Sequence, residues 1–203
     1  MNFELFFIYD SHCPWSYAST PLVTEIVQHF PNAQLHAWHS AHFQGDIAIN
    51  AKQIQQVTDT SQVVFSNQYR EQLEHYQDSV LVANLMAWVE KKLPDQYLSL
   101  LQALQIAHFE HANSLTNADQ LNEILQSFHL SPPSKVLNAD KLTKDAEYNL
   151  LNIIEMQDII GTQAIPALLL AVDSNLVLLN HNLYLNNPKN IIEAVKIELA
   201  KHQ

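Results

Sequence analysis

Patterns typical of β-strands occur only at the two ends of this 203-residue chain, and about a hundred residues between them show helical patterns alone. Phe3 to Tyr9 is a nearly continuous aromatic and β-branched run, as expected of a strand buried on both faces. Gln34 to Trp38 alternates like a second strand, and the residues between them carry apolar side chains at helical spacing. The opening is therefore predicted to be β-α-β, with parallel strands and a right-handed crossover.

From about Ala51 to Ile160 we expect no strand. Helical patterns are predicted here over Ser79 to Lys92, Asp95 to His108, Asn117 to Phe128 and Asp140 to about Ile159. Asn117 has the chemistry of a helix N-cap, with the side chain of Gln120 reaching back to it.

Strand patterns return over residues 167–172 and 176–179, joined by a hairpin connection, and a last helix is predicted from Asn187-Pro188. The second half needs the first to complete its sheet, so the helices are most economically an insertion. We therefore expect an α/β fold in which residues 1–50 and 160–203 form one domain and residues 51–159 form an embedded helical lobe.

Composition excludes several classes of function. The formal net charge of −11 and the pI near 5.3 disfavour binding to nucleic acid or to anionic membranes. No apolar run approaches the roughly 20 residues that cross a bilayer, and the N-terminus lacks the basic start of a signal peptide. The single cysteine, Cys13, cannot form an intrachain disulfide, which suits a reducing cytoplasm.

The most informative motif is Cys13-Pro14-Trp15-Ser16, placed where the first strand ends and a helix begins. Pro14 suits the first helical position, where its missing N–H costs nothing. Unpaired N–H groups and the helix dipole at that position should lower the pKa of Cys13 below about 8.5, and the Ser16 hydroxyl can donate to the sulfur. The alternative is a buried, inert cysteine, the usual state of a single cysteine.

Residues beside this motif admit two interpretations each. A charged His12 would help to hold a thiolate, whereas a His12 turned to solvent would do nothing. Trp15 and Tyr17 either line a groove for an apolar substrate or pack in the core.

The other histidines do not predict a metal site. His36, His39 and His42 are evenly spaced and Glu110 is flanked by two histidines, but no four-ligand set is completed nearby. We interpret these histidines as polar surface residues and expect no metal.

A second motif, residues 161–166 (Gly-Thr-Gln-Ala-Ile-Pro), directly precedes a predicted strand. A proline there marks a strand start or edge, and a cis Ile165–Pro166 bond is a minority outcome on base rates, at about 5–6% of such bonds.

Together, the strand–CxxS–helix opening, the helical lobe, the Gly-Thr-x-x-Ile-Pro segment and the closing ββα resemble the DsbA-like family, a thioredoxin fold with a helical insertion. The stretch from Phe6 to Tyr17 is most similar to the FrnE-type disulfide isomerase branch, which carries Cys-Pro-Trp-Cys. The resemblance implies that Cys13 is the nucleophile, that a cis Pro166 faces it, and that the Ile165 backbone pairs with an incoming peptide or glutathione.

Ser16 departs from this pattern because it stands where the resolving cysteine belongs. A mixed disulfide at Cys13 then cannot be released by internal attack and needs an external thiol. Kappa-class glutathione transferases and 2-hydroxychromene-2-carboxylate isomerases share the fold and insertion, but they place a serine at the position matching Cys13, and their glutathione-binding Asp-Arg pair is not evident in residues 180–183.

Three hypotheses follow. The first is a cytoplasmic thiol–disulfide oxidoreductase or isomerase that uses Cys13, Ser16 and Pro166 for catalysis and His12, Pro14, Trp15 and Ile165 for substrate binding. It would take glutathione as a possible co-substrate, bind no cofactor tightly, and act on a thiol- or disulfide-containing protein or small molecule. The second is a kappa-type glutathione-dependent transferase or isomerase, and the third is a binding module without turnover. The sequence does not indicate an oligomeric state.

Overall fold

The computed structural model describes residues 3–137 and 140–201. A four-stranded sheet with the order β2-β1-β5-β6 forms its centre. The first strand, β1 (Glu4–Tyr9), is parallel to β2 (Gln34–His39) on one side and antiparallel to β5 (Ala167–Val172) on the other. The edge strand β6 (Asn175–Leu178) forms a hairpin with β5. The predicted α/β class, the parallel opening strands and the closing hairpin are confirmed.

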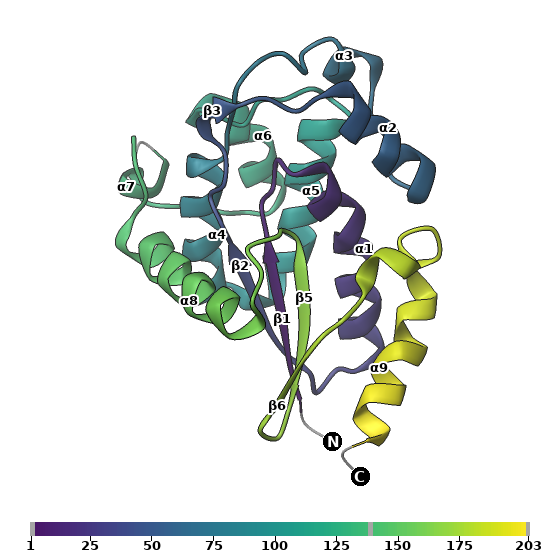
Figure 1. Ribbon diagram of the computed structural model, residues 1–203. Helices are drawn as coiled ribbons and strands as arrows, with labels where there is room; N and C mark the ends of the chain where they lie inside the picture. The colour runs from purple at the N-terminus through teal and green to yellow at the C-terminus, as the bar shows by residue number, and fades with distance from the viewer. Residues whose placement is uncertain (1–2, 138–139, 202–203) are drawn as a thin grey trace.

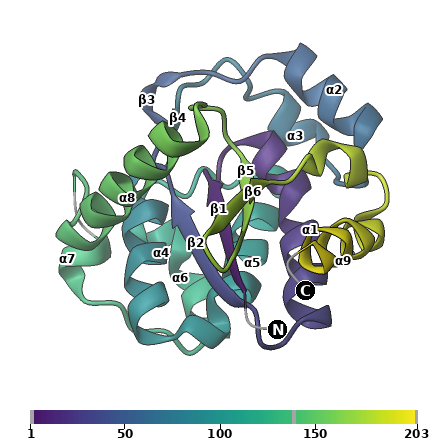
Figure 2. The ribbon, with the colours of Figure 1, turned by 60° about the horizontal axis from the view of Figure 1, so that its bottom comes forward.

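Alternate residues of β1 face two different layers of helices. Leu5 and Phe7 belong to a core shared with α1 (Pro14–His29) and α9 (Ile191–Ala200), whereas Phe6 and Ile8 pack with Ile153 of α8 (Lys144–Ile160). Figures 1 and 2 show α1 and α9 together on one side of the sheet and α8 on the other. Burial on both faces explains why the sequence of β1 is an almost unbroken apolar run.

The segment between the two halves of the sheet is mainly helical. It contains a short 3-10 helix at Pro94–Gln96 and the helices α2 (Ala51–Thr60), α3 (Asn67–Arg70), α4 (Val80–Lys92), α5 (Tyr97–Phe109), α6 (Ala118–Ser127), α7 (Ser134–Leu137) and α8. Two further 3-10 helices, His181–Tyr184 and Pro188–Asn190, follow β6. The four predicted helices are confirmed with shifted ends. The last of them begins at Lys144 rather than Asp140, because Thr143 is extended and its hydroxyl accepts the N–H of Ala146 at 3.5 Å.

Two local expectations need correction. The two-residue strand β4 (Gln77–Asp78) lies inside the supposedly strand-free segment and pairs with β3 (Gln44–Ile47), a polar stretch with no apolar alternation to reveal it. Asn117 does cap α6 by accepting the N–H of Gln120, but the Gln120 side chain accepts from the N–H of Thr116, not from Asn117.

Gly161 ends α8 in the left-handed conformation, with a φ of 68°, and the chain then turns toward β5. The Ile165–Pro166 bond immediately before β5 is cis, as the family resemblance implies. No helix in the described ranges is long and apolar enough to cross a bilayer.

Candidate active site

Cys13 lies in the turn that carries the chain from β1 into α1. Its N–H donates to the carbonyl of Asp10 at 3.1 Å, and its carbonyl accepts from the N–H of Tyr17 at 3.0 Å, so Cys13 is the N-cap of α1. Pro14 occupies the first turn, as predicted. The hydroxyl of Ser16 accepts the N–H of Asp10 at 3.2 Å, which leaves the hydroxyl proton available to a second acceptor.

The surroundings of the Cys13 thiol oppose its ionisation. Cys13 is only 7% exposed, and burial raises the pKa of the thiol above its ordinary value. Hydrogen bonds from the backbone and hydroxyl of Ser16 and from the backbone of Trp15 lower the pKa, and the charge of Asp10 raises it. The expectation of a lowered pKa is therefore wrong. The helix N-terminus does supply donors, but the loss of water outweighs them.

The cis-proline lies at the same edge of the sheet as Cys13. Ala167 pairs with Ile8, so Pro166 follows on at the end of β1 where the turn to Cys13 begins. A cleft of about 420 Å³ opens beside it, and its wall combines the Cys13 motif, the proline segment and the end of β6 through Trp15, Thr162, Ile165, Pro166 and residues 178–182. The structure thus brings Trp15, Ile165 and Pro166 together, whereas Cys13 lies outside the cleft lining.

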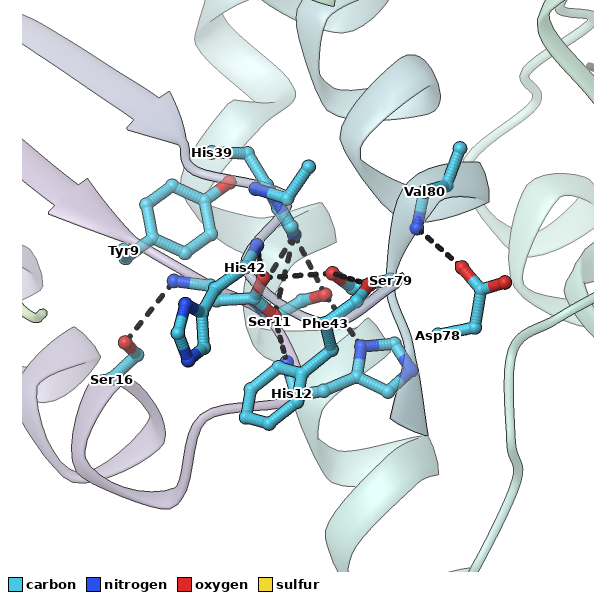
Figure 3. A network of polar contacts seen from close by, with 12 residues as sticks. Tyr9, Ser11, His12, Ser16, His39, His42, Phe43, Asp78, Ser79 and Val80 are labelled. Carbon is cyan, nitrogen blue, oxygen red and sulfur yellow. Dashed lines mark hydrogen bonds and ion pairs between the residues drawn. The ribbon is translucent and has the colours of Figure 1, made fainter. Parts of the chain in front are cut away.

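The buried carboxylate of Asp10 stabilises the turn between β1 and α1. Asp10 has no exposed surface, and its oxygens accept the N–H of His12 at 2.8 Å, the N–H of His42 at 2.7 Å and the hydroxyl of Ser79 at 2.7 Å. Burial alone would raise the pKa of Asp10, but His39 and His12 together with these donors lower it overall. The carboxylate is therefore ionised, and its bonds to His42 and Ser79 tie β1 to the loop after β2 and to the start of α4. Figure 3 shows Ser11, His12, His42 and Ser79 gathered at this point.

A one-way chain of hydrogen bonds runs through the same network. The carbonyl of Ser114 can only accept, so His12 donates to it from Nε2 at 3.1 Å, and its Nδ1 accepts the hydroxyl of Ser11 at 2.9 Å. The Ser11 oxygen then accepts from His39 Nε2 at 2.8 Å, and His39 Nδ1 accepts the N–H of Ala41 at 3.0 Å. The N–H of Ser11 also approaches His39 Nε2 at 3.1 Å, but the Ala41 bond fixes the proton on Nε2. Both imidazoles are held neutral, each as one tautomer.

The histidine predictions are consequently wrong at three positions. His12 has no exposed surface and its pKa is lowered by burial, so it neither points to solvent nor places a positive charge beside the sulfur, and it holds Ser114 instead of lining the cleft. His39 and His108 are each 3% exposed, and burial lowers the pKa of His39 to about 4. Within residues 3–137 and 140–201, no group of three His, Cys, Asp or Glu side chains is placed to hold a metal.

Two buried polar atoms near Cys13 have no hydrogen-bond partner in the described part of the chain. The ring of His108 packs against that of His12 at 4.1 Å and bonds the carbonyl of Asn113 through Nδ1, which leaves its Nε2 unpartnered. The hydroxyl of Tyr69 is also unpartnered. Burial and then the charge of Cys13 raise the pKa of Tyr69, so this phenol lies within electrostatic reach of the sulfur.

Tyr17 takes part in a different contact. Its hydroxyl donates to Glu110 at 2.7 Å, and its ring stacks on Phe109 at 4.7 Å. It lines a second cleft of about 370 Å³, between α1 and α5, rather than the cleft beside Pro166.

Comparison with known proteins bears on the fold. Neither the protein-family models nor the curated protein sequences give a match. The cytosolic disulfide reductase DsbM from Pseudomonas aeruginosa gives a TM-score of 0.81 at 15% identity, covering 97% of this chain and 98% of that one. A structure of DsbM with GSH gives 0.79 at 15% identity over 97% and 99%, and a candidate protein disulfide isomerase from Nitrosomonas europaea gives 0.75 at 14% identity over 100% of both chains. The chain has the DsbA-like thioredoxin fold.

The polar groups beneath the DsbA-like turn were missed from sequence. Asp10 directly follows β1 and His39 ends β2, and the carboxyl ends of two parallel strands meet at one sheet edge. That rule, applied to the predicted β-α-β unit, would have placed Asp10 and His39 together. Ser79, Tyr69 and Ser114 come from the helical segment, and no spacing in the sequence connects them to Cys13.

Proposed function

We propose that this protein is a thiol–disulfide oxidoreductase that works through a single cysteine, Cys13, with glutathione or another small thiol as co-substrate. The observation that carries the proposal is the position of Cys13 at the start of α1, at the same sheet edge as the cis Pro166, with the Ser16 hydroxyl one turn on. Residues 1–50 and 160–203 would form the thioredoxin-like domain, and residues 51–159 the lobe that covers the thiol.

The proposed reaction has two exchanges. The Cys13 thiolate attacks one sulfur of a disulfide, forms a mixed disulfide and expels the other sulfur as a thiolate, which takes up a proton. An external thiol then attacks the partner's sulfur and expels Cys13, so the external thiol ends in a disulfide with the retained half of the substrate, and the other half leaves as a thiol. With a glutathione mixed disulfide as substrate and glutathione as the external thiol, the products are the substrate thiol and oxidised glutathione. Ser16 would hydrogen-bond to the Cys13 sulfur whenever it carries negative charge.

The raised pKa of Cys13 favours reduction over oxidation. A strongly oxidising site stabilises its free thiolate and so releases its partner readily, whereas here burial works against the thiolate. A mixed disulfide at Cys13 should therefore persist until a reducing thiol is abundant, which suits a cytoplasmic setting. The fold match to a cytosolic disulfide reductase, and to that protein with GSH, supports this direction and this co-substrate.

Partner recognition is assigned to the cleft beside Pro166. Its floor is apolar near Trp15 and Ile165, and residues 180–182 (Asn-His-Asn) add neutral polar groups. We propose that the Ile165 backbone pairs with the backbone of the bound peptide or glutathione, and that Pro14 shapes the approach to the sulfur.

Intact mass after incubation with oxidised glutathione tests the proposal. One glutathione should attach to the wild type, none should attach to Cys13→Ser, and reduced glutathione should remove the adduct. Reversible glutathione binding without any adduct would instead indicate the kappa-type alternative, and the absence of both would indicate a binding module without turnover. As a second arm, turnover of a small glutathione mixed disulfide should disappear in Cys13→Ser.

A further inference from the structure

A large cleft remote in sequence from Cys13 concentrates positive charge on this acidic chain. It has a volume of about 1220 Å³ and lies where the end of α4, the short helix α7 and the start of α8 meet. Of the ten Lys and Arg residues in the sequence, five line it: Lys91, Lys92, Lys135, Lys141 and Lys144. With Asp140 and Asp145, the lining carries five positive and two negative charges, a net of +3, whereas the whole chain carries −11.

Most of this charge is not neutralised by the protein itself. Lys91 pairs with Asp145 at 2.6 Å, but the other four lysines form no ion pair with any residue that the structure describes. Lys92 and Lys144 are exposed at the ends of two well-formed helices, so their ammonium groups are free to meet a ligand.

Two of the lysines stand where a helix disfavours positive charge. Thr143 is the N-cap of α8 and Lys144 its first residue, and Lys141 lies two residues before the cap. The first N–H groups and the dipole already make this end of a helix positive, so lysines there reduce its stability. Asp145 and Glu147 in the first turn of α8 offset part of this positive charge, but neither pairs with Lys141 or Lys144, so both ammonium groups remain available to an anion.

The composition of the cleft indicates the kind of anion. All five cationic residues are lysines, which act as point charges and suit the tetrahedral phosphate group, whereas planar carboxylates are matched better by arginine. A helix N-terminus is itself favourable for phosphate. The partly exposed Trp88 adds a flat apolar face to the wall, on which a ring can stack.

We propose that this cleft binds a polyphosphate group through its unpaired lysines, and that the ligand also carries a flat ring that stacks on Trp88, as a nucleoside di- or triphosphate does. Free pyrophosphate shares the phosphate chemistry but lacks the ring. A nucleotide should therefore bind more tightly than pyrophosphate, and the difference in affinity distinguishes the two ligands.

Isothermal titration of the full chain with ATP, ADP and pyrophosphate tests the proposal. ATP should bind, more weakly as salt is raised, and pyrophosphate should bind less tightly than ATP. The double variant Lys92→Gln/Lys144→Gln should lose at least about tenfold in ATP affinity, since two charge-assisted contacts are removed. Lys189→Gln removes an exposed lysine far from the cleft and should bind ATP like the wild type.

Two further measurements separate binding from structural damage. Lys144→Gln should unfold at the same or a higher temperature than the wild type in the absence of ligand, because it removes a positive charge from a helix N-terminus. Trp88→Leu should reduce ATP affinity to that of pyrophosphate. Absence of ATP binding, or an equal loss in Lys189→Gln, would overturn the site, and equal affinities of ATP and pyrophosphate for the wild type would overturn the assignment of a ring-bearing ligand.

Discussion

Replacement of Asp10 by Asn perturbs the carboxylate beneath Cys13 with almost no change in shape. In its better orientation the amide oxygen replaces the carboxylate oxygen that serves both His42 and Ser79, and the amide NH₂ then faces the N–H of His12. One charge-assisted bond is lost and one N–H is buried without a partner. Loss of the charge-assisted bond costs about 1.5–3 kcal/mol, and the unpaired N–H adds a further cost. The free energy of unfolding should therefore fall by about 2–4 kcal/mol.

Urea unfolding near pH 7 measures this loss, with Asp46→Asn, an exposed aspartate, as the matched control. Because the pKa of Asp10 is lowered in the folded state, its contribution is present above the ordinary carboxyl pKa and is lost as pH falls. The difference between wild type and Asp10→Asn should therefore begin to shrink near the ordinary carboxyl pKa of about 4, and it should be lost only as pH falls through the lower pKa of the folded carboxyl.

The same variant has an opposite effect on the thiol. The negative charge of Asp10 raises the pKa of Cys13, so its removal should shift the midpoint of the alkylation rate against pH downward while the fold becomes less stable. Two results would refute this account of Asp10. One is an Asp10→Asn variant that unfolds at the same urea concentration as the wild type, and the other is an alkylation midpoint of Cys13 that moves to higher pH.

Four other outcomes are expected. In the wild type, alkylation of Cys13 should have a midpoint above about 8.5, and a lower midpoint would mean that the helix N-terminus outweighs burial. Ser16→Cys should form a disulfide with Cys13 under mild oxidation and raise insulin reduction, a gain that Cys13→Ala removes; if no disulfide forms, the two side chains are not neighbours. Tyr69→Phe should leave the free energy of unfolding unchanged or raise it by up to about 1 kcal/mol, since the lost hydroxyl has no partner, and a clear loss of stability would reveal one. The free energy of unfolding should fall as pH drops from about 6.5 to about 4, because His39 is protonated in the unfolded chain over this range but stays neutral in the folded protein. This site alone accounts for about 3 kcal/mol, and His39→Gln should make the free energy of unfolding depend less steeply on pH.

The order of strands and helices could be predicted because each pattern is local. The apolar run of β1, the alternation in β2 and the capping residue Asn117 carry their information within a few positions. The strands β3 and β4 could not be predicted, since a polar stretch and a two-residue strand leave no periodic pattern.

The candidate site divides in the same way. The Cys13 motif and Pro166 were accessible from sequence, because helix starts and prolines before strands have recognisable chemistry. The pKa of Cys13 was predicted in the wrong direction, since the local donors are visible in sequence but the covering residues are not. Tyr69 lies 56 positions away from Cys13 along the chain, and only the folded lobe brings the two into electrostatic reach.

The position of β1 between β2 and β5 has a consequence for how this protein is made. Its partner β5 ends at residue 172, so a ribosome must add about 160 residues after β1 before the second edge of that strand can pair. At translation rates of about 5–20 residues per second, the delay is roughly 8–30 s. During that interval one of the most apolar segments of the nascent chain has an open hydrogen-bonding edge, which any other strand can occupy. Slow stretches of the message beyond β2 would lengthen this interval, and a chaperone that binds residues 3–9 during it would keep the open edge from pairing with another chain.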